Sequence, residues 1–270
     1  MIAPSTVSPE AHRYIRGQLD ALAAREGVRI LFAIESGSRA WGFPSADSDY
    51  DVRFVYARSA DRYRSVRDVR DVIETPTLDD PVLGVPLDLN GWDVRKALQL
   101  ALRSNPVLRE WLVSPVRYGE VAGAALEMLD LVDRVTDRAS YAYHYDRLAR
   151  GAWDRLAEAG DRVKVKRYCY ALRPVLMLRW LSSRRGLPPM DAASLAGGLD
   201  LGEEVLASMA RLFDLKRDAD EQDFLPRQPV LDALIAETLA VKAARPPQVE
   251  ADTLDWPAAD AAFHRLIGAD

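Results

Sequence analysis

VRILFAIESGSRAWGFPSADSDYDVRFVY, residues 28–56, is the stretch of sequence that decides the fold. Its first eight residues are rich in branched side chains and too few for a helix, which predicts a buried strand. A polar turn containing glycine and serine follows. The last eight residues, DYDVRFVY, alternate polar and apolar side chains, so we expect a second strand with Asp49, Asp51 and Arg53 on one face.

Outward from this stretch, strand patterns give way to helical ones. A strand is expected within residues 69–74, and VPLDLNGW from Val85 predicts a third core strand in which Asp88 points away from its apolar neighbours. Helical spacing then predicts helices near residues 93–103, 106–112, 119–133, 138–159, 162–185, 202–215, 229–244 and 256–267. We therefore predict an α+β fold, with a mixed sheet and flanking helices in residues 1–135 and an α-helical domain in residues 136–270.

Composition excludes several classes of protein. A single cysteine, Cys169, excludes an internal disulfide framework and suits a reducing compartment. The N-terminal residues lack the apolar run of a signal peptide, and no stretch approaches the ~20 uncharged apolar residues that a membrane span needs. We therefore expect a cytoplasmic protein with no membrane partner. The net charge of −5 argues against a dedicated binder of duplex DNA.

The charge is unevenly distributed along the chain. Residues 138–190 hold twelve Lys and Arg against four Asp and Glu, although the whole chain is acidic. Within this region Lys166, Tyr170 and Arg173 share one helical face. That face can contact a triphosphate, contact RNA or form an ordinary solvated surface, and the sequence leaves these three interpretations open.

The turn between the first two strands has the composition of a phosphate site. Gly37 and Ser38 allow close backbone approach and supply donors for the terminal phosphates of a nucleoside triphosphate (NTP). Arg39 follows them in sequence and can pair with a phosphate. These three residues are therefore the candidate nucleotide contacts at this turn.

The neighbouring strands supply carboxylates for a divalent metal. Asp49 and Asp51 lie roughly 6–7 Å apart along one strand face, a spacing at which two side chains converge on Mg²⁺ or Mn²⁺. Asp88, from the third strand, would complete a two-metal site. Asp93 is the alternative third carboxylate, but its position before VRKALQLAL is typical of a helix N-cap.

Together these features resemble the DNA polymerase β-like nucleotidyltransferase superfamily. Within it, four blocks of sequence are similar to the YcgL/RlaP-type predicted nucleotidyltransferase family: ESGSRAWGFPSADSDYDVRFVY, LDLNGWDVRKAL, SNPVLREWL and KRYCYALRPVLMLRW. The resemblance covers residues 28–190 and is weaker beyond them. It implies a nucleotidyltransferase-type sheet in the N-terminal domain and a helical domain that contributes to the nucleotide cleft.

The resemblance also implies a reaction and a role for each residue. The reaction is transfer of a nucleoside monophosphate (NMP) from an NTP, here expected to be ATP, to an acceptor hydroxyl with release of pyrophosphate. Gly37 and Ser38 would contact the phosphates, and Asp49 and Asp51 would bind Mg²⁺. Asp88 would ligate the catalytic metal and help to deprotonate the acceptor.

The acceptor cannot be identified from the sequence. An RNA 3′ end, a protein side chain and a small molecule all remain open, and the basic middle region favours RNA. The alternative function is a non-catalytic, nucleotide-binding regulatory module. A P-loop kinase is disfavoured because the sequence contains no G-x-x-x-x-G-K-[ST] after a strand.

Overall fold

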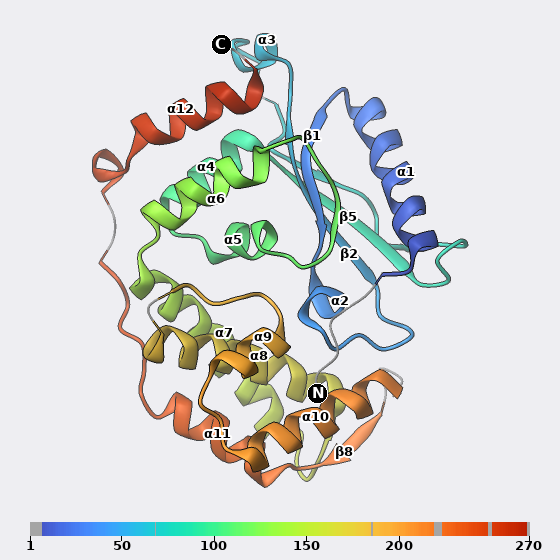
Figure 1. Ribbon diagram of the computed structural model, residues 1–270, viewed down its shortest axis with the longest axis vertical. Coiled ribbons are helices and arrows are strands. Elements are labelled where there is room, and N and C mark those ends of the chain that lie inside the picture. Colours follow the sequence, from blue (N-terminus) through green and yellow to red (C-terminus); the bar gives the residue numbers. More distant parts are fainter. Residues whose placement is uncertain (1–6, 68, 185, 219–222, 248–249, 269–270) are drawn as a thin grey trace. The chain divides into compact units, whose positions relative to one another are not determined.

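The protein is described by a computed structural model in which the chain forms two compact units (Figure 1). The structure describes residues 7–67, 69–184, 186–218, 223–247 and 250–268. Among these residues, the sheet unit comprises 7–39, 49–136 and 250–268, and the helical unit comprises 40–48 and 137–247. Each unit thus gathers separate stretches of sequence, whereas two continuous domains, residues 1–135 and 136–270, were expected.

A mixed sheet forms the centre of the sheet unit. Its strands are β1 (Arg29–Glu35), β2 (Tyr50–Ala57), β3 (Val72–Glu74), β4 (Leu78–Asp79), β5 (Pro86–Asp93) and β6 (Arg117–Glu120). They are ordered β3-β5-β2-β1-β6, and β4 also pairs with β5. β2 and β5 run parallel, whereas the other pairs are antiparallel. The sheet therefore places one parallel strand pair at its middle.

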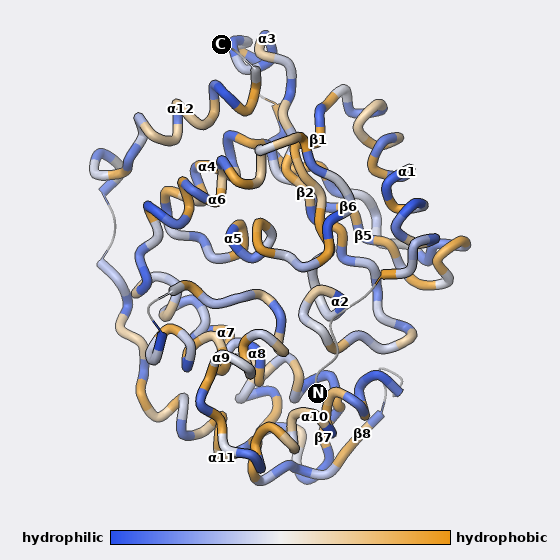
Figure 2. Tube along the Cα trace, viewed as in Figure 1, coloured by the Kyte–Doolittle hydropathy of each residue, from blue (hydrophilic) through white to orange (hydrophobic). Residues whose placement is uncertain are grey.

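Helices cover both faces of this sheet (Figure 1). One face packs against α1 (Pro9–Glu26), which begins at the Ser8 cap and ends at Gly27 in the left-handed conformation. The other face is covered by α4 (Val94–Leu102), α5 (Pro106–Leu112), α6 (Ala124–Val135) and α12 (Trp256–Ile267). Figure 2 shows hydrophobic residues along the central strands, as expected for a sheet buried on both faces.

The helical unit has a core of its own. It contains α7 (Arg138–Ala157), α8 (Val165–Ser183), α9 (Ala192–Gly198), α10 (Glu203–Asp218) and α11 (Pro229–Leu239), with β7 (Arg162–Lys164) and β8 (Phe224–Pro226) as an antiparallel ribbon. The central helix is α8, in which Tyr168, Cys169 and Leu172 are fully buried. Phe43, from the loop between β1 and β2, stacks on Phe213 in this core.

The predicted α+β arrangement, a mixed sheet with flanking helices and then a helical region, is confirmed. Four strands and three helices were not expected: β4, β6, β7, β8, α2, α3 and α9. β6 lies where the chain was expected to be a loop and then a helix, and α6 begins at Ala124 instead. These strands are two to four residues long, and such short segments show too few periods of alternation to be recognised. The shortest helical elements are α2 (Gly37–Trp41), α3 (Ala60–Tyr63) and a 3₁₀ turn (Ala251–Thr253).

The helices were also compared with the length and hydropathy that a membrane span needs. In the part of the chain that the structure describes, no helix is both long enough and apolar enough to cross a bilayer.

Candidate active site at one end of the sheet

Two of the three predicted carboxylates, Asp51 and Asp88, lie together where β1 ends and β2 and β5 begin. β2 and β5 are parallel, and their register places Asp51 directly opposite Asp88. Neighbouring strands lie about 4.8 Å apart, and residues in register point to the same face. Asp51 and Asp88 therefore lie side by side on the face that carries α4, although 36 residues separate them in the sequence.

Arg53 joins these two carboxylates. One terminal nitrogen of its guanidinium, Nη2, donates to Asp51 Oδ1 at 3.1 Å and to Asp88 Oδ2 at 2.8 Å. The other, Nη1, donates to the backbone carbonyls of Val52 and Asp88. All three charged side chains are half-buried. The arginine thus supplies a fixed counter-charge at the point between the two carboxylates.

Gly37 lies directly against Asp51. Its φ is +59°, in the left-handed region, and a Cβ built on it would lie 2.0 Å from Asp51 Oδ2. Ser36, which lies between β1 and Gly37, is also bonded to Asp51, because Ser36 N donates to Asp51 O at 2.8 Å. Only glycine fits both the conformation and the space. Ser38 follows in α2, a helix of five residues whose short backbone contributes little macrodipole.

Asp49 and Arg39 are placed differently from the register pair. Asp49 lies just before β2, and its side chain is exposed. Its backbone carbonyl accepts a hydrogen bond from Arg39 Nε at 3.1 Å, and the Arg39 guanidinium lies 4.0 Å above the Tyr50 ring. The structure therefore brings Asp51 and Asp88 together, whereas Asp49 lies just before the first residue of β2.

The donor atoms of this site suit a divalent metal that also takes ligands from water and substrate. Within the described ranges, no three Asp, Glu, His or Cys side chains are gathered closely enough to hold a metal by themselves. Mg²⁺ commonly uses only one or two carboxylates and takes its other ligands from water and substrate phosphates. The carboxylate oxygens of Asp51 and Asp88 fit that requirement, since both are hard donors on one face.

A buried glutamate, Glu35, supports the site from behind and was not singled out in the sequence. Glu35 Oε1 accepts from Asp51 N at 2.8 Å, and Glu35 Oε2 accepts from the hydroxyl of Tyr118 on β6. Burial raises the pKa of Glu35 to about 8, although both hydrogen bonds lower it. The pKa of the Tyr118 hydroxyl is raised, first by burial and then by Glu35. A glutamate at the end of a strand gives no sequence signal, because its partner comes from a strand 83 residues away.

Asp93, the alternative third carboxylate, lies at the opposite end of β5. It caps α4 by accepting from Arg95 N at 2.9 Å, and the Tyr63 hydroxyl donates to it at 3.0 Å. Burial raises the pKa of its carboxyl group. The prediction of a helix N-cap is confirmed.

Lys166, Tyr170 and Arg173 all lie on α8 in the helical unit, but their surroundings differ. Lys166 Nζ lies 5.7 Å from the centre of the Tyr170 ring, which is 39% exposed. Arg173 is buried, donates from Nε to Met190 O at 3.1 Å, and lies 4.5 Å above the Trp41 ring. The face that looks uniform in sequence therefore has an exposed end and a buried end.

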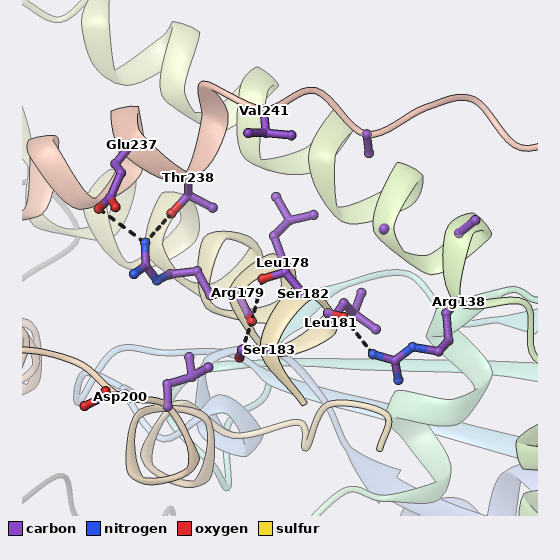
Figure 3. A pocket seen from close by; sticks show the side chains of 14 residues that line it. Arg138, Leu178, Arg179, Leu181, Ser182, Ser183, Asp200, Glu237, Thr238 and Val241 are labelled. Atoms are coloured by element: carbon purple, nitrogen blue, oxygen red, sulfur yellow. Dashed lines mark hydrogen bonds and ion pairs between the residues drawn. The ribbon is translucent and has the colours of Figure 1, made fainter. Parts of the chain in front are cut away.

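A cavity of about 580 Å³ also lies in the helical unit, lined by α7, α8, α11 and the residues that follow α9 and α11 (Figure 3). Arg179 lies at one side, where it donates to Glu237 and Thr238. Arg138 lies at the other and donates to the backbone carbonyl of Leu181. None of the residues that line this cavity is among the site residues predicted from sequence.

Known proteins similar to this chain were found by family, by sequence and by structure. Residues 11–265 match RlaP, described as the RNA repair pathway DNA polymerase beta family. Uncharacterized protein YcgL from Bacillus subtilis (strain 168) is 41% identical over 219 residues, which cover 81% of each chain. The crystal structure of a nucleotidyltransferase-like protein from Exiguobacterium sibiricum 255-15 covers 85% of this chain and 74% of its own. Its TM-score of 0.32 and 10% identity are too low to support an inference.

Proposed function

Because the chain belongs to the RNA repair pathway DNA polymerase beta family, we propose that it transfers an NMP from an NTP to an acceptor hydroxyl. The observation that carries this proposal is the register pair of Asp51 and Asp88 beside Gly37. Two carboxylates can hold the metal that neutralises phosphate charge in phosphoryl transfer, and a tightly turned backbone can bind the phosphates. Of the three acceptor classes that the sequence leaves open, RNA is favoured by the family description.

Each residue of the site has a part in this reaction. The backbone at Gly37 and Ser38 binds the phosphates of the NTP, and Arg39 adds a charged donor nearby. Asp51 and Asp88 would hold Mg²⁺ or Mn²⁺, with Asp49 as a further carboxylate at the strand entrance. When bound, the metal supplies positive charge that neutralises the phosphate oxygens.

The chemical step forms one bond and breaks one. The acceptor oxygen attacks the α-phosphorus, the bond from that phosphorus to the leaving pyrophosphate breaks, and Asp88 takes the proton of the acceptor hydroxyl. We propose ATP as the nucleotide. Glu35 fixes the backbone of Asp51 from the buried side and takes no part in the step.

The experiment is to incubate the protein with α-labelled NTPs, Mg²⁺ and RNA that carries a free 3′ hydroxyl. Label on the RNA, with pyrophosphate released in equal amount, is the expected result. Asp51→Asn should abolish it, whereas the control Asp130→Asn, an exposed carboxylate on α6, should not. NTP binding without pyrophosphate release on RNA, protein or small-molecule acceptors would instead favour the regulatory module.

A further inference from the structure

A basic hollow lies in the helical unit, on the exposed part of the α8 face. Its volume is about 330 Å³. It is lined by Ala152, Arg155, Lys164, Lys166, Arg167 and Tyr170. Four of these six side chains carry a positive charge, and none of the six is acidic. Like charges held together repel one another, so such a lining favours an anion between them.

The fold gathers these charges from three successive elements. Arg155 comes from the last turn of α7, Lys164 from the end of β7, and Lys166 and Arg167 from the first turn of α8. Arg167 Nη1 donates to Arg155 O at 3.0 Å, which fixes the start of α8 against the end of α7. One of the lining side chains thus also joins the two helices that form the hollow.

Aromatic rings accompany two of the cations. Lys166 Nζ lies 5.7 Å from the Tyr170 ring centre, and Lys164 Nζ lies 5.9 Å from the Phe224 ring centre. Tyr170 is 39% exposed and Phe224 on β8 is 49% exposed. Each pair offers one stacking surface next to one positive charge, and the two pairs come from different elements.

We propose that this hollow binds the single-stranded RNA that accepts the NMP, an inference that rests on the proposed function. The cations would contact successive phosphates, and Tyr170 and Phe224 would stack on bases. Single strands are bound in this way, by basic grooves interleaved with aromatic rings. A mononucleotide has one base, whereas two pairs of ring and cation offer contacts to more than one nucleotide of a strand. Arg173 is buried against Trp41 and takes no part.

The test measures binding of a fluorescent single-stranded RNA to the full chain in EDTA without NTP, so that it does not depend on catalysis. Lys164→Ala/Lys166→Ala should weaken binding by about tenfold or more. It should also reduce the slope of log K against log salt by about 1.4, which corresponds to two phosphate contacts on a single strand. Tyr170→Ala should weaken binding by roughly tenfold without changing that slope, and Tyr170→Phe should restore it.

Two controls separate local contacts from general charge and from folding. Arg147→Ala removes one exposed charge from α7 outside the hollow and should leave affinity nearly unchanged. Lys166→Arg keeps the charge and should bind RNA as the unchanged protein does. Only variants that keep the circular dichroism spectrum and melting temperature of the unchanged protein are compared.

Three results would overturn the proposal. In the first, the double lysine variant keeps the RNA affinity and the salt slope of the unchanged protein. In the second, it loses no more RNA affinity than Arg147→Ala does. In the third, it loses ATP affinity in a nucleotide titration but keeps its RNA affinity. The last would assign the hollow to the triphosphate. Asp51→Asn should still bind RNA, because the substitution lies outside the hollow. If the unchanged protein binds RNA through the hollow but transfers no NMP, the proposed reaction is refuted and the assignment of the hollow to RNA is retained.

Discussion

Replacing Arg53 by methionine tests whether a divalent metal and the arginine share the same two carboxylates. Methionine keeps similar length and removes the charge that Nη2 places 3.1 Å from Asp51 Oδ1 and 2.8 Å from Asp88 Oδ2. In the metal-free protein this leaves two neighbouring carboxylates without that counter-charge. A bound metal ion would restore a positive charge between the two carboxylates.

The size of the effect follows from the exposure of the three side chains. A buried hydrogen bond to a charged group contributes about 1.5–3 kcal/mol, and an exposed ion pair about 0–1 kcal/mol. The side chains of Arg53, Asp51 and Asp88 are 19%, 30% and 22% exposed, between these limits. We therefore expect Arg53→Met to lower the free energy of unfolding in EDTA by about 1–3 kcal/mol for both contacts together.

The assay is urea denaturation of both proteins with and without Mg²⁺. A ligand at ten times its dissociation constant stabilises the folded state by about 1.4 kcal/mol. Because the variant's carboxylates no longer share their charge with Arg53, they should bind Mg²⁺ more tightly, and Mg²⁺ should stabilise the variant more than the unchanged protein. Lys96→Met is the control, since it breaks an ion pair with Asp71 in the same unit and should leave the Mg²⁺ effect unaltered.

The expectation fails if Mg²⁺ stabilises the Arg53 variant and the unchanged protein equally. The metal would then not bind between Asp51 and Asp88. If Arg53→Met instead leaves the free energy of unfolding in EDTA unaltered, the two hydrogen bonds make no net contribution to that free energy.

Three further predictions concern single residues. Gly37→Ala should lower the free energy of unfolding by about 1–2 kcal/mol, because Gly37 has a φ of +59°. It should also lower turnover, because the new methyl group displaces the Asp51 carboxylate. Unaltered turnover would contradict this expectation. Asp88→Asn should keep measurable NTP affinity while kcat falls by roughly 10²-fold or more, and steady-state kinetics with a nucleotide titration separates the two. Burial raises the pKa of the Cys169 thiol to about 12. A disulfide reagent at pH 8 should therefore label Cys169 only as urea unfolds the helical unit. Rapid labelling of the native protein would contradict this expectation.

The sequence by itself determined the local elements of the site. Strand-length runs and period-two alternation in residues 28–56 predict β1, the turn and β2, and they place Asp51 and Arg53 on one face, as the structure has them. The cap at Asp93 is equally local, because its partner lies two residues away. Patterns of this kind depend only on the geometry of one element.

Only the tertiary structure decided which of these residues meet. The pairing of Asp51 with Asp88 follows from the register of two parallel strands, and a shift of one residue would turn Asp88 to the other face. Arg53 bridges the pair, and Glu35 reaches Tyr118 across the sheet, for the same reason. The basic hollow likewise needs α7, β7 and α8 to pack together. Periodicity records which face of an element a residue occupies, but the partner of that face is set by packing between segments distant in sequence.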